Sequence, residues 1–307
     1  MTALSVVIVN YNTREHLRAC LESLRRVGPP EVLVVDNTSS DGSPEMVRSL
    51  YPWVTLLENE TNPGYGNGAN LGIASCSSDY VLLLNSDTLL EARAIDALRN
   101  YLDRNPRVAL VGPRLNNADG TLQPSCYAFP TPWHIFLQES SLGRVIRFVP
   151  GLRERSFQTW SHAAVREVPW LLGAALAIRR AAFEEVGGFD TSFFMYYEEV
   201  DLCFRLRQAG WQVHFAPVTR ITHVGGASTS QVRAEMLVQW FASIQHFYQR
   251  HYSRVRLVTL VLIVKAVVFG RLIRDIIYLF ITRDPTERVR LTESFTGWRR
   301  ILLGQSS

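Results

Sequence analysis

The chain contains a single lysine, Lys265, in a sequence of 307 residues. A phosphate-binding P-loop needs a lysine in a glycine-rich loop after the first strand, so this class of nucleotide site is excluded. Cysteine is also scarce, and the four cysteines form no C-x-x-C pair, which indicates free, buried thiols in a reducing compartment. The N-terminus lacks a basic segment and a cleavage site, so we expect the mature protein to begin at Met1, in the cytoplasm.

The net charge of +4 is unevenly distributed along the chain. Residues 1–230 hold 20 basic and 23 acidic residues, whereas residues 231–307 hold 12 basic and 5 acidic ones. A nucleic-acid-binding protein would spread its arginines along the whole chain, so nucleic acid is not expected as a partner. We expect a mildly acidic domain over residues 1–230 and a basic tail over residues 231–307, suited to an anionic membrane surface.

Strand-like and helix-like segments alternate through the first hundred residues. Four short apolar segments have the composition of strands buried on both faces: residues 4–9, 31–35, 54–57 and 80–84. A helix is expected after each strand, the first capped by Asn12, the second beginning near Pro44, and the others over residues 64–75 and 91–104. This alternation predicts an α/β fold with a doubly wound, mainly parallel sheet.

Polar side chains follow each of these strands, where ligands bind in such sheets. Asp36 can accept the ring N–H of a uracil or thymine, and Tyr11 can stack on that base. Residues 62–70 offer glycines where a backbone can approach a nucleotide, and side-chain amides for ribose or phosphate. The predicted nucleotide-binding residues are Asn10, Tyr11, Asn12, Asp36, Asn37, Asn62, Gly66, Asn67, Asn70 and Ser86.

Asp87 directly follows the strand predicted at residues 80–84. A hard divalent cation such as Mg²⁺ binds one or two carboxylates together with phosphate oxygens, so Asp87 is a candidate metal ligand. Capping of the following helix is the alternative for this aspartate. His223, at a predicted strand end, is either a metal or phosphate ligand or a structural histidine.

Three carboxylates, Glu198, Glu199 and Asp201, follow an aromatic segment at residues 193–197. Acidic residues at a helix start are stabilised by the helix dipole, but one is sufficient for that purpose. A carboxylate in apolar surroundings has a raised proton affinity and can take a proton from an alcohol. The cluster is therefore the candidate general base.

Periodicity is lost over residues 113–168, where we expect irregular loops that face an acceptor. Later segments predict a strand at 168–178 broken by Gly173, helices at 183–186 and 201–209, and strands at 211–215 and 220–223.

The tail is expected to be helical throughout. Its apolar run, residues 257–269, is too short to span a bilayer, which takes about 20 residues. Extension to residue 281 places Lys265, Arg271, Arg274 and Asp275 on about half of the helical wheel, which favours a helix lying in the membrane interface. A core-packing helix pair and a homodimer interface are the alternatives.

Several motifs within residues 5–230 resemble those of the family 2 glycosyltransferases of the GT-A fold, in both order and spacing. The resemblance covers about three quarters of the chain. It is strongest to the rhamnosyltransferase-like branch, which builds bacterial cell-surface polysaccharides. The matching motifs include VVIVNYN, VVDNTSSDGS, NPGYGNGANLGI, YVLLLNSDT, GGFDTSFFMYYEEVDLCFRLRQAGW and THVGGAS.

The resemblance implies a role for individual residues. Asp36 would read the base, and Asp87 would be the last aspartate of a DXD-like metal motif whose first position is Asn85 here. His223 would complete the site for a divalent cation, Mg²⁺ or Mn²⁺. The family's catalytic base belongs to a Glu-Asp pair, and Glu199, after Glu198, stands at the base position with a longer side chain.

The resemblance also implies the reaction and its substrates. A hydroxyl of a saccharide or polyprenyl-linked acceptor would displace the nucleotide diphosphate from a dTDP- or UDP-sugar, with inversion at the anomeric carbon. The branch that the chain resembles favours dTDP-rhamnose as the donor. Residues 1–112 would bind the donor and residues 113–230 the acceptor. The acceptor- or sugar-binding residues would be Trp170, Gly173, Ala174 and Asp201. For Asp201 the alternative is a structural role near the site, together with Arg205. The enzyme would be associated peripherally with the inner face of the plasma membrane.

Two other functions remain open at this point. A nucleotidyltransferase would need a glycine-rich loop with basic residues after the first strand, and residues 10–13 are no such loop. A non-catalytic, membrane-associated scaffold of the same fold is the second alternative, because Glu199 stands where the family has the aspartate of its Glu-Asp pair.

Overall fold

The computed structural model describes residues 3–28, 31–139, 160–225, 233–282 and 284–304. The chain forms two compact units. Unit 1 comprises Met1–Phe129, Ser156–Phe194 and Glu198–Ser228, and unit 2 comprises Pro130–Arg155, Met195–Tyr197 and Thr229–Ser307.

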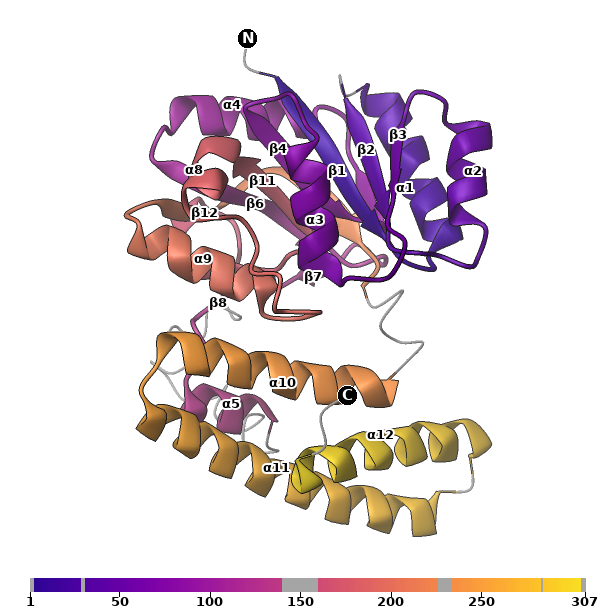
Figure 1. The fold of residues 1–307 in the computed structure, drawn as a ribbon, viewed down its shortest axis with the longest axis vertical. Coiled ribbons are helices and arrows are strands. Elements are labelled where there is room, and N and C mark those ends of the chain that lie inside the picture. Colours follow the sequence, from indigo (N-terminus) through magenta and orange to yellow (C-terminus); the bar gives the residue numbers. More distant parts are fainter. Residues whose placement is uncertain (1–2, 29–30, 140–159, 226–232, 283, 305–307) are drawn as a thin grey trace. The chain divides into compact units, whose positions relative to one another are not determined.

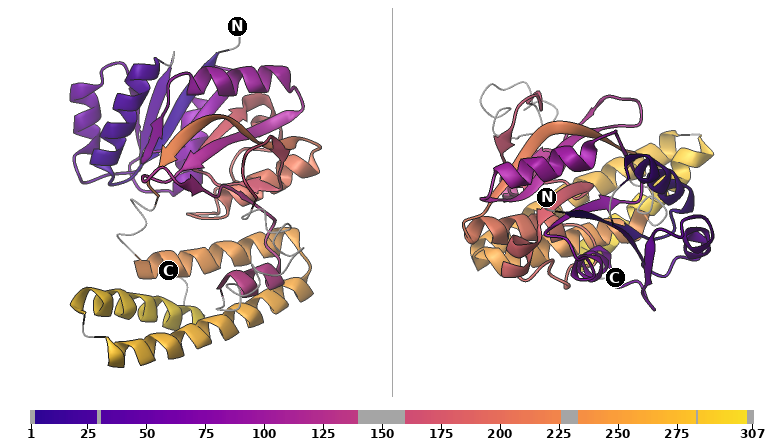
Figure 2. Two further views of the ribbon diagram at one scale, coloured as in Figure 1. Left: turned by 180° about the vertical axis from the view of Figure 1, so that it is seen from behind. Right: turned by 90° about the horizontal axis from the view of Figure 1, so that it is seen from above.

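Unit 1 is built on one large mixed sheet with the strand order β3-β2-β1-β4-β11-β6-β12-β5 (Figure 1). Its strands are β1 Leu4–Asn10, β2 Val32–Asp36, β3 Thr55–Glu58, β4 Tyr80–Asn85, β5 Thr88–Leu90, β6 Val108–Asn116, β11 Ala175–Arg179 and β12 Gln212–His223. Six of the eight run in one direction, and β11 and β5 run opposite to them. The view from behind in Figure 2 shows β12, in orange, curving beside β6. The predicted mainly parallel α/β fold is confirmed.

Short strands extend this arrangement. β7 (Leu122–Gln123) pairs with β6, and β9 (Arg166–Glu167) pairs with β12. β8 (Cys126–Tyr127) and β10 (Trp170–Leu171) form a separate two-stranded sheet.

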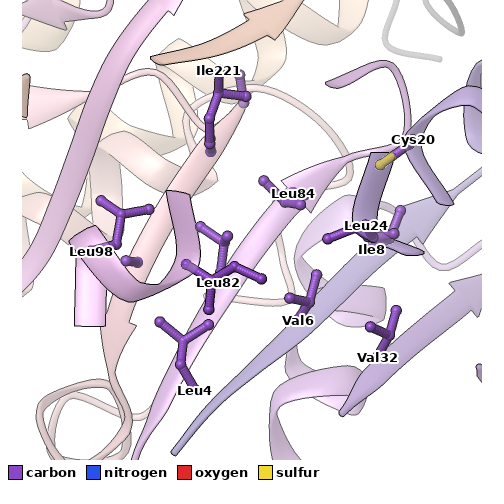
Figure 3. Packing of buried hydrophobic residues seen from close by; sticks show 14 of the residues in the cluster. Leu4, Val6, Ile8, Cys20, Leu24, Val32, Leu82, Leu84, Leu98 and Ile221 are labelled. Carbon is purple, nitrogen blue, oxygen red and sulfur yellow. The ribbon is translucent and has the colours of Figure 1, made fainter. Parts of the chain in front are cut away.

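Helices cover both faces of the large sheet. Helices α1 (Arg14–Val27), α2 (Ser43–Leu50) and α4 (Ala94–Arg104) supply apolar side chains to the cluster on one face, which Figure 3 shows around Ile8 and Leu82. Helices α3 (Tyr65–Ala74), α8 (Arg180–Glu185) and α9 (Glu198–Gln208) do so on the other. The alternate side chains of β1 belong to opposite clusters, as expected for a strand buried on both faces. All four cysteines are free and buried, as predicted.

Several predicted elements differ from the structure. Thr13, not Asn12, is the N-cap residue of α1, because Asn12 adopts a positive φ of 52° and its Oδ1 accepts a hydrogen bond from the N–H of Ser40. Asp87 caps no helix, since β5 follows it. The strand expected at 168–178 is divided into β10 and β11, and the two strands expected at 211–223 are one bulged strand, β12.

The segment expected to be irregular, residues 113–168, contains the end of β6, the short strands β7, β8 and β9, and helix α5 (Pro132–Glu139). Its remaining part, residues 140–159, lies outside the described residues.

Most of the described residues of unit 2 are helical. It contains α5, α10 (Arg233–His251), α11 (Arg254–Ile281) and α12 (Pro285–Leu303). Asp284 caps α12 by accepting a hydrogen bond from the N–H of Thr286, and Pro285 occupies the first helical turn. Within the described part of the chain, no helix combines the length and the apolar character needed to cross a bilayer.

Candidate active site

The polar ends of three neighbouring strands meet at one edge of the sheet. In the parallel register Asn10 of β1 lies opposite Asp36 of β2, and Val9 lies opposite Asn85 of β4. The sequence therefore predicted correctly that residues around positions 10, 36 and 85 lie close together.

Asp36 is buried and accepts hydrogen bonds from within the chain. Nδ2 of Asn10 donates to its Oδ2 at 2.7 Å, and the N–H of Ser39 donates to its Oδ1 at 2.7 Å. The hydroxyl of Thr13 donates to Oδ1 of Asn10 and lies 2.7 Å from the hydroxyl oxygen of Ser86. This network fixes the ends of β1, β2 and β4, and the reading of a base by Asp36 stays a prediction.

The other predicted nucleotide-binding side chains surround this network. Tyr11 is 38% exposed, as a stacking residue must be. Asn37 donates from Nδ2 to the carbonyl oxygen of Gly64, and Oδ1 of Asn62 accepts from the N–H of Gly64. These bonds hold the connection between β3 and α3 next to the strand ends.

The glycine-rich start of α3 packs against the segment that precedes α9. A Cβ on Gly66 would lie 3.2 Å from the Cβ of Phe189, so glycine permits this contact. The amide of Asn70 forms two hydrogen bonds with the backbone of Phe189, and Nδ2 of Asn67 donates to the carbonyl oxygen of Thr191. These contacts explain the residue types without a ligand, and nucleotide binding by Gly66, Asn67 and Asn70 stays a prediction.

Asp87 and His223 lie side by side, although 136 positions separate them in the sequence. Oδ1 of Asp87 is 3.3 Å from Nε2 of His223, and its Oδ2 accepts a hydrogen bond from the N–H of Gly225. Antiparallel pairing of β5 with the end of β12, in which Thr88 lies opposite His223, produces this proximity. Burial raises the pKa of Asp87, but a His223 ring that carries a proton on Nε2, together with the hydrogen bond from the N–H of Gly225, outweighs it and lowers the pKa below its usual value.

Gln123, on β7, orients the imidazole of His223. Its Nε2 donates to Oδ1 of Asn117 and to the carbonyl oxygen of His223, so its Oε1 is the atom that faces Nδ1 of His223, at 2.8 Å. A carbonyl oxygen only accepts, so Nδ1 carries a proton, and in the neutral ring the lone pair of Nε2 is directed at Asp87 and Asn85.

This arrangement fits a divalent cation. Two acceptor atoms, Nε2 of His223 and Oδ1 of Asp87, face each other at 3.3 Å, and this requires a positive charge between them or a proton on the ring. Carboxylate and imidazole are both metal ligands, and diphosphate oxygens would supply further ones. The described residues contain no group of three or more acidic, histidine or cysteine side chains that could hold a metal by itself.

Glu198 and Glu199 begin α9. Glu198 is buried, and Glu199 is partly buried, with its Oε2 atom lacking a hydrogen-bond partner among the described residues. Burial raises the pKa of Glu199 to about 6, although backbone N–H groups, including those of Gly173 and Val200, offset part of the increase. The pKa of Glu198 is raised well above its usual value, by burial and then by the charge of Glu199. Each of the two adjacent carboxyl groups therefore takes up a proton more readily than an exposed glutamate does.

Gly173 and Ala174 link the acidic pair to the predicted metal site. The N–H of Gly173 stabilises the carboxylate of Glu199, and the carbonyl oxygen of Ala174 accepts from the N–H of Asn85 at 3.0 Å. The Tyr65 hydroxyl donates to the carbonyl oxygen of Gly173. The pKa of Tyr65 is raised well above its usual value by burial, then by the charges of Glu198, Glu199 and Asp87. The carboxylates of Glu198, Glu199 and Asp87 thus all lie near the hydroxyl of Tyr65.

Two predicted acceptor-side residues have structural contacts. Trp170 stacks on Tyr127, with ring centroids 4.6 Å apart, and donates from Nε1 to the carbonyl oxygen of Ala128. Asp201 is fully buried and pairs with Arg205 at 2.6 Å, and Arg205 also donates to the carbonyl oxygens of Val186 and Gly188. This geometry favours a structural role for Asp201.

Sequence reasoning missed Gln123 and Tyr65 as site residues. Tyr65 lies inside the glycine-rich motif, where the neighbouring glycines and asparagines were the stronger candidates for nucleotide binding. Gln123 follows a turn in a segment without periodicity, and only the pairing of β7 with β6 brings it to His223. No local pattern in the sequence identifies Gln123.

Comparisons with known proteins agree with this fold. Residues 5–187 match the family model described as glycosyl transferase family 2. An N-acetylglucosaminyl-diphospho-decaprenol L-rhamnosyltransferase of Mycobacterium tuberculosis is 33% identical, over 81% of this chain and 85% of that protein.

Two solved structures share the fold. The mannosyltransferase PcManGT from Pyrobaculum calidifontis, in complex with GDP-Man and Mn²⁺, has a TM-score of 0.54 at 19% identity, over 99% of this chain and 88% of that chain. GalNAc-T7 with UDP, GalNAc and Mn²⁺ has a TM-score of 0.55 at 14% identity, over 80% of this chain and 48% of that chain. From the family match and the identity to the mycobacterial relative, we conclude that the chain belongs to the family 2 glycosyltransferases.

Proposed function

We propose that this glycosyltransferase moves a sugar, rhamnose, from a nucleotide-diphosphate donor to a hydroxyl of a polyprenyl-linked saccharide, with inversion at the anomeric carbon. The observation that carries the proposal is the carboxylate of Glu199, whose pKa is raised to about 6 and whose Oε2 atom, like that of Glu198, has no partner in the described part of the chain. Such a group is ionised at neutral pH and still accepts a proton readily, as a general base requires.

The proposed reaction is a single displacement. The carboxylate of Glu199 takes the proton of the acceptor hydroxyl while the hydroxyl oxygen forms a bond to the anomeric carbon of the donor. The bond from that carbon to the diphosphate oxygen breaks, and its electron pair leaves with the nucleotide diphosphate. Glu198 lies beside the proposed base, and burial together with the charge of Glu199 raises its pKa well above the usual value, which disfavours a second negative charge at this point.

Asp87 and His223 are the residues that we propose hold Mg²⁺ or Mn²⁺, with Gln123 orienting the imidazole. When bound, the cation supplies positive charge that stabilises the diphosphate leaving group. Two structures that share the fold contain Mn²⁺ with a nucleotide or a nucleotide sugar, which supports this assignment.

The donor and acceptor assignments have separate support. The mycobacterial relative is named as an L-rhamnosyltransferase that acts on a decaprenyl-linked sugar diphosphate. Tyr11, at 38% exposure, and Asp36 are the proposed contacts to a thymine or uracil base, which favours dTDP-rhamnose and keeps UDP-sugars as the alternative. We assign donor binding to residues 1–112 and acceptor binding to residues 113–230. Residues 231–307 form the amphipathic tail.

A polyprenyl-linked acceptor lies in a bilayer, so the proposed reaction takes place at a membrane surface. We propose peripheral association with the inner face of the plasma membrane, because a nucleotide-sugar donor is available in the cytoplasm.

The proposal is tested by incubating the full chain with Mn²⁺ and dTDP-, UDP- or GDP-sugars, with and without a short-chain polyprenyl-diphospho-N-acetylglucosamine acceptor. We expect acceptor-dependent release of dTDP, or of UDP, and a rise in the melting temperature with the same nucleotides. No turnover with any donor, together with unchanged nucleotide binding by Asp87→Ala, would exclude a transferase. Stabilisation by GDP-sugars alone would exclude base reading by Asp36.

A further inference from the structure

Helix α11 exposes a continuous row of large apolar side chains along its length. Six of them are between 45% and 85% exposed: Val255, Val258, Leu262, Phe269, Ile273 and Phe280. They recur at intervals of three, four or seven residues, so they lie on one side of the helix, which we call the α11 apolar face. Monomeric proteins rarely expose apolar patches of this extent, and such patches mark interaction sites.

The opposite side of α11 packs within unit 2. Leu260, Val264 and Val268 are buried there, and the guanidinium of Arg271 lies 4.9 Å from the ring centroid of Trp298. Asp275 is fully buried and accepts hydrogen bonds from Arg274. Of the four charged residues expected on one half of the helical wheel, Arg271 and Asp275 thus lie on the side of α11 that packs within unit 2.

Cations border the α11 apolar face on both sides. At about 100° per residue, Arg254 and Lys265 fall on one edge, and Arg256 and Arg274 fall on the other. The half of the helix between them carries no charged side chain. Since Asp275, the only acidic residue of α11, is buried, the exposed surface of this helix presents no carboxylate.

We infer that the α11 apolar face inserts into the surface of an anionic phospholipid bilayer, with the helix lying parallel to the membrane. Apolar side chains enter the acyl region, while the long stems of Lys265 and the flanking arginines let their charges remain at the headgroups. Charge complementarity favours anionic lipid, because each cation near such a surface strengthens binding. The inference rests on the proposed function in one respect, namely that a lipid-linked acceptor requires the enzyme at a bilayer.

A second copy of the chain fits this face less well. In a twofold dimer the same patch meets itself, so its cationic edges would face cationic edges. The exposed surface of α11 offers no carboxylate to pair with them. Like charges placed together across an interface oppose association.

The test measures sedimentation of the full chain with vesicles of phosphatidylcholine alone or mixed with phosphatidylglycerol. We expect at least about tenfold stronger partitioning into the anionic vesicles, reduced by high salt. Phe269→Glu places a charge at the centre of the α11 apolar face and is expected to weaken partitioning at least about tenfold. Leu50→Glu, at a half-exposed leucine of α2 in unit 1, is the matched control and should bind like the unchanged protein.

Three results would overturn the inference: no vesicle binding by the unchanged protein, equal binding of Phe269→Glu, or equal binding to both vesicle types. A dimer in analytical ultracentrifugation that Phe269→Glu dissociates would also overturn it and assign the face to a subunit interface. Turnover of a water-soluble acceptor analogue without vesicles separates this inference from the proposed function. If that turnover occurs but vesicles do not bind, only the membrane inference fails; if vesicles bind and no donor is used, only the proposed function fails.

Discussion

Gln123 and His223 form two hydrogen bonds with each other, and this pairing fixes which ring nitrogen of the histidine faces Asp87. Oε1 of Gln123 lies 2.8 Å from Nδ1 of His223, and Nε2 of Gln123 donates to the carbonyl oxygen of the same histidine at 3.4 Å. The side chain of one residue thereby holds both the ring and the backbone of the other. A metal ligand held in this way is already oriented before the metal binds.

Replacement of Gln123 by alanine should weaken Mn²⁺ binding. Loss of a group that orients a metal-ligating histidine typically reduces metal affinity about 10- to 100-fold, and we expect a decrease in this range. Electron paramagnetic resonance of free Mn²⁺, titrated with protein and dTDP, measures the affinity without turnover. Gln123→Glu keeps an acceptor for Nδ1 and should retain most of the affinity, and Gln208→Ala, at the exposed end of α9, is the control. Unchanged affinity in Gln123→Ala would mean that Gln123 does not orient a metal ligand.

Glu199→Gln should reduce kcat far more than Glu198→Gln. General-base catalysis contributes about 10²- to 10⁴-fold, and the glutamine amide cannot take a proton, so we expect a loss of this size with a small change in the KM for the donor. Glu198 is not the proposed base, and glutamine has nearly the same size and shape as glutamate, so kcat should fall less than about tenfold in Glu198→Gln. Steady-state release of nucleotide measures both. A larger effect in Glu198→Gln would transfer the role of base to Glu198.

The pH dependence of kcat/KM should show one acidic limb near pH 6. The proposed base, Glu199, must be ionised to act, and its pKa is raised to about 6, so we expect activity above this pH and a fall of about tenfold for each unit below it. The limb should persist in Glu198→Gln, because the shift of Glu199 arises first from burial and not from its neighbour. A limb that stays near the ordinary value of 4.5 for glutamate would contradict the assignment.

The sheet edge could be predicted from the sequence because it depends on local signals. Apolar runs ending in Asn10, Asp36 and Asn85 define parallel strands, and parallel strands place their carboxyl ends together. The apolar composition of each strand and the polar residue at its end were sufficient to predict this edge of the sheet.

The other half of the site depends on long-range pairing, which leaves no periodic signal. β5 has three residues and β7 has two, too few for any alternation to be visible, yet they bring Asp87 and Gln123 to His223. The inward orientation of Arg271 on α11 could not be predicted either, because it depends on contact with Trp298 in another helix. Hydropathy alone does not determine which side of a helix meets a partner.

Gly64 is the position where the backbone itself should tolerate least change. It has a φ of +91°, and an added Cβ would lie 2.3 Å from the carbonyl oxygen of Phe194, which accepts a hydrogen bond from the N–H of Tyr65. Gly64→Ala should therefore lower the free energy of unfolding by about 2–5 kcal/mol, from backbone strain and from overpacking together. Gly187→Ala is the matched control, since Gly187 has a φ of +79° but no atom within 4 Å of the added Cβ, and only the strain, about 1 kcal/mol, should be seen.

Urea unfolding followed by circular dichroism measures the two variants under the same conditions. The difference between them isolates the contact of Gly64 with Phe194, because both glycines share the left-handed backbone region. Displacement of Phe194 also disturbs the segment that leads to Glu198 and Glu199, so Gly64→Ala should lose kcat at temperatures where it remains folded. Equal stability of the two alanine variants would mean that this segment moves aside without cost and does not help to hold the acidic pair in position.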